Sequence, residues 1–296
     1  MANRLSGSRP PDLLGTGFRT VQDWLFWLLC TVAMVCIVGP AVWIIAGLLK
    51  TSGPALRPSL LTETTAQGGL QNAILGTLVL AVGVVLIAGT LGIGAGIYLA
   101  EFAPARLART LRIFPEVLAG VPSIVIGYTG YLLLVMQFHW GFSILSAVIA
   151  LSALVTPYIV RSTEVALSQV PTTLREASLA LGLPVVVQMR RVLLPPALPA
   201  IVTGLIVAIA ISTGETAPLL YTANFSNADP TLQVAGNHPV GYLTYVTYYY
   251  IQLPGEKNHA LANAAGAVTL IFLLILTLVG RLLASSSARR TARMGL

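Results

Sequence analysis

Residues 72–100 read NAILGTLVLAVGVVLIAGTLGIGAGIYLA, a run of 29 residues without a charged side chain. A helix needs about 20 predominantly apolar residues to cross the hydrocarbon core of a bilayer, so this stretch predicts a transmembrane helix. Five more stretches meet the same criterion: 24–49, 113–137, 141–160, 196–222 and 261–284. The sequence therefore predicts an all-α membrane protein with six transmembrane helices.

The overall composition agrees with this prediction. Hydrophobic residues make up 56% of the 296 residues, charged residues only 9%, and the mean hydropathy is +0.83. Soluble globular domains carry roughly 25% charged residues, and disordered chains are poor in apolar ones. Both classes are therefore excluded. The sequence has no Gly-rich phosphate loop of the P-loop type, so we do not expect the chain to hydrolyse nucleotide by itself.

The basic residues concentrate on one side of the predicted helices. The net charge is +7, but the positive side chains lie in short segments between apolar stretches, which argues against a nucleic-acid partner. Fourteen fall on one side: Arg4, Arg9, Arg19, Arg106, Arg109, Arg112, Arg161, Arg175, Arg190, Arg191, Arg281, Arg289, Arg290 and Arg293. Three fall on the other side: Lys50, Arg57 and Lys257. Because positive residues are enriched in cytoplasmic loops, both ends of the sequence are expected in the cytoplasm.

This topology divides the sequence into four parts. They are a cytoplasmic segment 1–23, the first helix with an extracytoplasmic loop over 24–71, a core 72–284 with five helices, and a cytoplasmic tail 285–296. Within the core, the loop 161–195 is predicted on the cytoplasmic side and is long enough to carry structure of its own.

That loop, 161–195, shows helical periodicity on both sides of Pro184. It is too polar to span a membrane and too apolar to remain free in water, which predicts a helix pair along the membrane face that offers one side to a partner. Ala177 and Ser178 are small enough to let this helix approach a partner closely. Gly182 permits a sharp reversal, which a bulky replacement is expected to crowd.

The same loop contains a sequence motif. Glu176-Ala177-Ser178, Gly182 and Val192-Leu193-Leu194-Pro195 together resemble the EAA motif of ABC importer permeases, with Ser in place of the second Ala and Val in place of Ile. The resemblance implies a type I ABC importer permease core, whose coupling loop docks into a groove on a separate ATPase subunit. The positions that it assigns to ATPase coupling are Glu176, Ala177, Ser178, Gly182, Leu194 and Pro195. The chain itself is then a non-catalytic membrane subunit, and the partner hydrolyses ATP.

Other segments narrow the resemblance. Residues 91–101, 120–127 and 157–164 resemble the permeases of phosphate-specific ABC importers. Residues 214–222 resemble the A-type of the two permeases in such importers. The resemblance implies a multi-pass protein of the bacterial inner membrane that pairs with a second phosphate permease. It also implies two copies of an ATP-binding subunit and an extracytoplasmic phosphate-binding protein, with membrane lipid around the helices and no cofactor or metal. The alternative is an importer for another oxyanion, such as phosphonate, sulfate or molybdate.

An acidic residue within the fifth stretch marks a candidate substrate path. An acidic side chain at the bilayer centre costs about 2.5–3.5 kcal/mol, so Glu215 must face a cavity or a partner helix. In a continuous helix, Ser212, Glu215 and Thr216 would form one polar strip. Pro218 would free the Gly214 carbonyl oxygen. A carboxylate accepts a proton that phosphate can donate near neutral pH and sulfate cannot, so Glu215 is suited to select phosphate.

The sequence does not decide which positively charged group pairs with the transported anion. Related sequences often carry an Arg one turn before this acidic residue, where this chain has Ile211. The expected partner is either Arg161 or a group on the second permease. The candidate substrate path therefore consists of Ser212, Glu215, Thr216 and Arg161.

Other features of the sequence have structural interpretations. Gly92 and Gly96 are spaced for close helix packing. Pro122 and Ser123 predict a kink in the third helix. The tyrosines of the loop 223–260 are expected at the membrane interface. They are Tyr242, Tyr245, Tyr248, Tyr249 and Tyr250.

Two other classes of membrane protein are disfavoured. A secondary transporter usually shows paired repeats with interrupted helices at matching positions, and none is visible in the sequence. An intramembrane hydrolase needs a Ser–His or His–Asp set at membrane depth. His139, His238 and His259 all fall at the ends of predicted helices or in loops.

Overall fold

The computed structural model describes residues 16–53, 56–231 and 233–293, and all regular structure in these ranges is helical. The chain divides into two compact units, Met1–Lys50 and Thr51–Leu296, which are described separately here. Most of the predicted N-terminal segment lies outside the described residues.

The first unit contains most of α1, which extends over Thr16–Ser52 and includes the first predicted span. Large apolar side chains are exposed along the helix, and Trp24, Trp27 and Trp43 are 66%, 69% and 81% exposed. A helix that is hydrophobic all round is typical of a membrane span.

The second predicted span is one continuous run of helix. It consists of α2 (Gln71–Val84), the π-helical turn η4 (Val85–Gly89), α3 (Thr90–Ile97) and the π-helical turn η5 (Tyr98–Phe102). A Cβ atom added at Gly92 would lie 2.7 Å from the Cβ of Ile159, and one at Gly96 would lie 2.6 Å from the Cβ of Thr163. Both partners belong to α6 (Ile144–Ser168), so the predicted close packing of the glycine pair is confirmed.

The third predicted span is bent rather than straight. α4 (Ala105–Ala119) meets the helix formed by α5 (Ser123–Gly130) and η6 (Tyr131–Gln137) at an angle of 95°. The predicted kink at Pro122 and Ser123 is therefore confirmed, but the helix begins at Ala105, before the predicted start of the span 113–137. Pro122 has no backbone N–H and an extended ψ of 136°, so it cannot continue α4.

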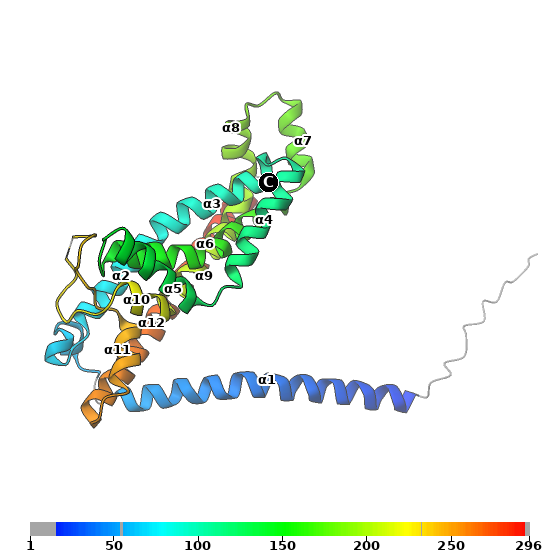
Figure 1. Ribbon diagram of the computed structural model, residues 1–296. Helices are drawn as coiled ribbons and strands as arrows, with labels where there is room; N and C mark the ends of the chain where they lie inside the picture. Colours follow the sequence, from blue (N-terminus) through cyan, green and yellow to red (C-terminus); the bar gives the residue numbers. More distant parts are fainter. Residues whose placement is uncertain (1–15, 54–55, 232, 294–296) are drawn as a thin grey trace, which may run out of the picture. The chain divides into compact units, whose positions relative to one another are not determined.

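The remaining helices complete the second unit (Figure 1). After α6 they are α7 (Thr172–Ala180), α8 (Val185–Val187), the π-helical turn η7 (Gln188–Leu193), α9 (Leu194–Gly214), α10 (Ala217–Thr222), α11 (Leu243–Tyr250) and α12 (Glu256–Arg293). Two 3₁₀ turns, η2 (Pro58–Leu61) and η3 (Thr65–Gln67), precede α2. Within this unit, α7 and α8 lie at one end and α11 at the other (Figure 1).

Five helices within the described residues are long and apolar enough to cross a membrane, and the bent pair raises the number to six. The five are Val21–Ser52, Gln71–Phe102, Ile144–Ser168, Val185–Gly214 and Glu256–Leu282. This agrees with the six predicted spans. One difference is that α6 continues to Ser168, eight residues into the predicted loop 161–195.

α6 is the central helix of the second unit. Its buried side chains, among them Leu151, Val155 and Ile159, pack in one apolar cluster with residues of α2, α9 and α10. It is also the most buried of the spanning helices. The helix that leads into the coupling loop is therefore held on most sides by the rest of the unit.

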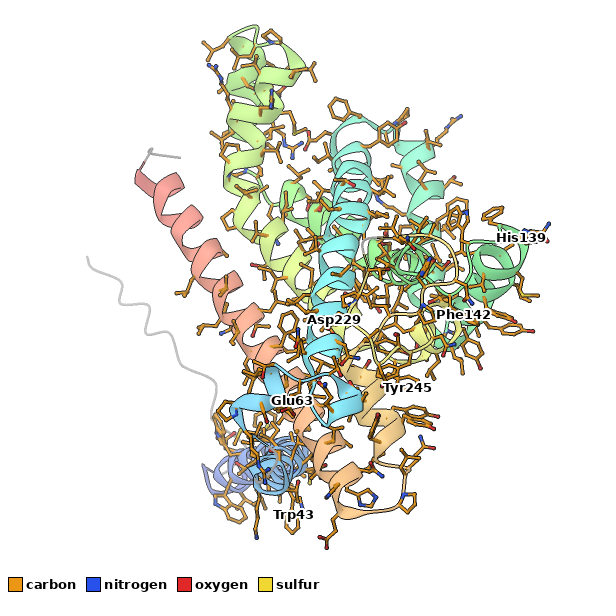
Figure 2. All side chains as sticks on the ribbon, turned by 90° about the vertical axis from the view of Figure 1, so that its left-hand side faces the viewer. Trp43, Glu63, His139, Phe142, Asp229 and Tyr245 are labelled. Carbon is orange, nitrogen blue, oxygen red and sulfur yellow. The ribbon has the colours of Figure 1, made fainter. Side chains whose placement is uncertain are left out.

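Four tyrosines of the loop 223–260 form an aromatic cluster with Phe225: Tyr242, Tyr245, Tyr249 and Tyr250. Tyr242 is 1% exposed, and burial raises the pKa of its phenol above the usual value. Tyr245, which is labelled in Figure 2, is another member of the cluster. Its ring stacks on Phe225 with ring centroids 4.3 Å apart and on Tyr249 with centroids 5.3 Å apart. Tyr242 belongs to the buried core, whereas Tyr249 is 43% exposed.

Candidate functional sites

The predicted coupling loop folds as a helix pair, which we call the coupling hairpin (residues 172–193). α7 ends just before Gly182, which adopts the left-handed conformation with a φ of 63°. The Gly182 N–H donates to the Leu179 carbonyl oxygen at 2.9 Å, and the Leu183 N–H donates to the Ser178 carbonyl oxygen at 3.2 Å. These two bonds are those of a Schellman motif and satisfy the last carbonyls of the helix. The predicted reversal at Gly182 is confirmed.

The motif residues of α7 divide between an outer and an inner face. Glu176 and Ala177 are exposed. Ser178 is only 3% exposed, and its hydroxyl donates to the Arg175 carbonyl oxygen at 2.7 Å. Ser178 therefore cannot approach a partner as the sequence suggested, because it packs against its own chain.

Leu194 and Pro195 lie at the base of the coupling hairpin. Leu194 packs against the buried apolar cluster beneath it, and Pro195 lies where the π-helical turn η7 passes into α9. Around the reversal, the hairpin carries exposed apolar side chains that sequence reasoning missed: Leu179, Leu181, Val185 and Val186. Exposed apolar patches of this kind mark sites of contact with another protein or a membrane.

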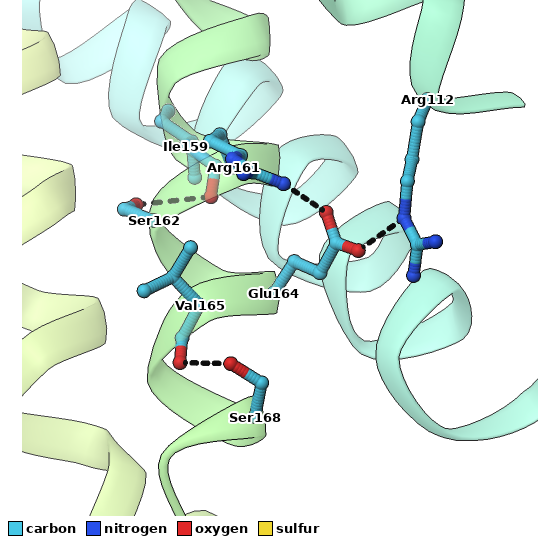
Figure 3. A network of polar contacts seen from close by, with 7 residues as sticks. All are labelled: Arg112, Ile159, Arg161, Ser162, Glu164, Val165 and Ser168. Atoms are coloured by element: carbon cyan, nitrogen blue, oxygen red, sulfur yellow. Dashed lines mark hydrogen bonds and ion pairs between the residues drawn. The ribbon is translucent and has the colours of Figure 1, made fainter. Parts of the chain in front are cut away.

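A cavity of about 240 Å³ lies between α4 and α6, and we call it the ion-pair cavity. Its acidic and basic lining residues are Arg112, Glu116, Arg161 and Glu164. The Glu164 carboxylate is buried and held twice (Figure 3): Arg112 Nε donates to Oε1 at 2.5 Å, and Arg161 Nη1 donates to Oε2 at 3.3 Å. The Arg161 side chain stays 63% exposed, so its guanidinium can also reach an anion.

The fifth predicted span is interrupted at the second candidate site. α9 ends at Gly214, Glu215 has an extended backbone with a ψ of 136°, and α10 begins at Ala217. The Thr244 hydroxyl donates to the Glu215 carbonyl oxygen at 3.0 Å, which fixes the break against α11. The prediction of one helix over 196–222 is therefore wrong.

The break separates the polar residues that the sequence placed together. Ser212 is 1% exposed, and its hydroxyl donates to the Ile209 carbonyl oxygen of the preceding turn at 2.9 Å. Glu215 and Thr216 are partly exposed in the break itself. The single helical strip through Ser212, Glu215 and Thr216 is thus not formed. Pro218 lies in the first turn of the new helix and does not kink a continuous one.

Arg161 and Glu215 belong to different levels of the helix bundle. Ser162, the neighbour of Arg161, packs against Gly204 of α9. Gly204 precedes Gly214 by ten residues, which corresponds to about 15 Å along a helix axis. The ion-pair cavity and the break at Glu215 are therefore two separate sites.

This chain is similar to known proteins in its sequence and in its fold. The family described as "Binding-protein-dependent transport system inner membrane component" matches residues 92–293. The "Phosphate transport system permease protein PstA 2" of Mycobacterium bovis is 44% identical over 98% of this chain and 96% of its own length. The "Phosphate transport system permease protein PstA" of Haemophilus influenzae is 34% identical over 91% of this chain and 92% of its own length.

A solved structure shares the fold. A chain of the MetNI methionine ABC transporter in an inward-facing conformation matches with a TM-score of 0.60 at 21% identity, covering 74% of this chain and 95% of that chain. The predicted all-α fold of a type I importer permease is thereby confirmed. Since the family covers more than half of the sequence and its relatives nearly all of it, this chain is a member of the binding-protein-dependent transport system inner membrane components.

Proposed function

We propose that this chain is a permease subunit of an ATP-driven importer of inorganic phosphate. The observation that carries the proposal is that relatives named as phosphate permeases match this chain over more than nine-tenths of its length. In this function, the chain forms the translocation path with a second permease, and an extracytoplasmic binding protein delivers phosphate. Two copies of a separate ATPase subunit supply the energy, so the chain itself performs no hydrolysis.

The coupling hairpin is the proposed contact with the ATPase. Its outer face presents Glu176 and Ala177 next to the exposed apolar side chains around Gly182. A surface that combines a small residue, an apolar patch and a charged residue is suited to insertion into a groove on another protein. Ser178, Leu194 and Pro195 support this role indirectly, since they keep the shape of the hairpin.

Glu215 is the proposed group that distinguishes phosphate from fully deprotonated oxyanions. Its side chain is partly exposed at the break between α9 and α10, and no partner for its carboxylate is found among the described residues. An ionised carboxylate accepts hydrogen bonds and donates none. It therefore favours an anion that still carries a proton, as phosphate does near neutral pH. Arg161 offers a cationic group at a separate point of the same path.

The variant Glu215→Gln tests this mechanism, because it keeps the size of the side chain and adds a donor. In proteoliposomes that hold the complete complex, we expect phosphate uptake to fall about tenfold, the effect of losing a hydrogen bond to a charged group. The matched control is Glu256→Gln, the same change at an exposed position in the first turn of α12, which should transport normally.

Two results would contradict the role of Glu215 as a selective group. One is near-normal phosphate uptake by the Glu215→Gln complex at matched protein levels. The other is loss of assembled protein in both Glu215→Gln and Glu215→Ala, which would make the residue a structural one.

A further inference from the structure

Arg175 joins the coupling hairpin to two other helices. Its Nη1 donates to Glu101 Oε2 at 2.6 Å, and its Nη2 donates to the Leu167 carbonyl oxygen at 2.7 Å. Glu101 lies in η5 at the end of the second span, and Leu167 lies in the last turn of α6. One guanidinium group of α7 therefore holds the ends of two spanning helices.

This ion pair is largely withdrawn from solvent. The side chains of Arg175 and Glu101 are 25% and 11% exposed. Leu167 belongs to the buried apolar cluster that also contains Met189 and Leu193 of η7. The other carboxylate oxygen, Glu101 Oε1, is buried and has no hydrogen-bond partner among the described residues. Since a buried carboxylate is costly once its only partner leaves, Glu101 has to follow Arg175 when the hairpin moves.

Both ends of this connection adjoin the ion-pair cavity. Leu99, two residues before Glu101 in the same π-helical turn, lines the cavity. Glu164, about one helical turn before Leu167, is the buried carboxylate that the cavity contains. A displacement of Arg175 is therefore expected to move both the cavity wall at Leu99 and the carboxylate of Glu164.

We propose that Arg175 and Glu101 form the mechanical link through which movement of the coupling hairpin shifts the walls of the ion-pair cavity. The link rests on the proposed function, because it assigns two positioning residues to the ATP-driven cycle. Apolar side chains beneath the hairpin can slide past one another, whereas the planar guanidinium of Arg175 donates from its two Nη atoms to two acceptors in a fixed geometry. The ion pair thus transmits the displacement of the coupling hairpin to the ends of the two spanning helices. Without the ion pair, ATP hydrolysis proceeds with little transport.

The test compares Arg175→Met and Glu101→Gln with a control, Arg109→Met, in the complete complex. Arg109 is exposed on α4, and no ion pair is found for it within the described residues. Phosphate uptake and ATP hydrolysis are measured in the same proteoliposomes, together with the amount of ATPase subunit bound. We expect both single variants to keep the ATPase and to hydrolyse ATP, while the phosphate moved per ATP falls about tenfold, a usual size for coupling between sites.

A double variant with the two charges exchanged distinguishes the effect of the ion pair from the effect of the shapes of the two side chains. The double variant Glu101→Arg with Arg175→Glu should recover part of the lost transport per ATP, because the attraction between the two positions is restored with opposite polarity, although the bond to the Leu167 carbonyl oxygen is not. Unchanged transport per ATP in both single variants would overturn the link, and so would a reversed pair no better than either of them. Loss of bound ATPase from Glu101→Gln would also overturn it, since the pair would then only hold the shape of the hairpin. A wild-type complex that imports no phosphate would instead overturn the proposed function, and the link with it.

Discussion

Arg112 Nε lies 2.5 Å from Glu164 Oε1 and so ties α4, the first half of the bent third span, to the central helix α6. Arg161 holds the other oxygen of the same carboxylate. Because the Glu164 side chain is only 9% exposed, water can replace little of this bonding. Both arginines of the ion-pair cavity are thus positioned by one buried acid.

Arg112→Met should lower the stability of the protein, because it removes the shorter of the two hydrogen bonds to Glu164. A hydrogen bond to a charged group contributes about 1.5–3 kcal/mol, and the 42% exposure of Arg112 places the loss at the lower end of that range. Thermal unfolding in detergent should show a lower midpoint for Arg112→Met. The further addition of Glu164→Gln weakens only the longer contact with the exposed Arg161, so it should cost little more. Equal midpoints for wild type and Arg112→Met would refute the structural role of this bond.

Gly182→Ala should impair transport about as much as Gly182→Leu. The sequence suggests crowding at the reversal, but an added Cβ would meet no atom within 4 Å. The cost comes from the left-handed backbone, which disfavours a residue with a Cβ by roughly 1–2 kcal/mol. Asn adopts this conformation more readily, so Gly182→Asn should retain most of the activity. Phosphate uptake by the three variants at matched protein levels distinguishes backbone strain from crowding. Normal uptake by Gly182→Ala but not by Gly182→Leu would show that the size of the side chain causes the loss.

Gly96→Ala should reduce the yield and thermal stability of folded protein, because its Cβ would lie 2.6 Å from the Cβ of Thr163. Overpacking of this kind typically costs about 1–3 kcal/mol. Gly94 provides a control on the same helix, since a Cβ there meets nothing within 4 Å. Gly94→Ala should therefore be neutral or slightly stabilising. Equal behaviour of the two variants would mean that α3 and α6 are not in close contact.

Two single cysteines test the predicted orientation. Gln169, which follows α6, is predicted in the cytoplasm, and Asn227, which follows α10, is predicted outside; both side chains are exposed. In a background without Cys30 and Cys36, an impermeant thiol reagent added to intact cells should label Asn227→Cys and spare Gln169→Cys. Permeabilised cells should label both. Reagent bound to Gln169→Cys in intact cells would show that the charge count gives the wrong orientation.

The helical framework could be predicted from the sequence because it depends on local properties. The length of the apolar stretches located the spans, and the spacing of Gly92 and Gly96 predicted their contact with another helix. Gly182 could be identified because the backbone conformation that ends a helix has its own residue preference. The bend at Pro122 was predicted in place, but its 95° angle was not, since the angle depends on how α5 packs on α10.

The long-range contacts of the ion-pair cavity and of the Arg175–Glu101 link could not be predicted. Arg112 and Glu164 are 52 residues apart, and Arg175 and Glu101 are 74 residues apart, so no local pattern joins them. The break at Glu215 was also missed. Apolar residues continue on both sides of it, and the hydroxyl that fixes its backbone comes from 29 residues later in the chain.

ATP-dependent uptake of radiolabelled phosphate shows whether the assembled complex transports this substrate. The vesicles would contain this chain, the second permease and the ATPase, with the extracytoplasmic binding protein supplied on the outer side. We predict saturable phosphate uptake that requires ATP and persists in an excess of sulfate or molybdate. Absence of ATP-dependent phosphate uptake by the assembled complex, or uptake of sulfate at the same rate, would contradict the proposed function.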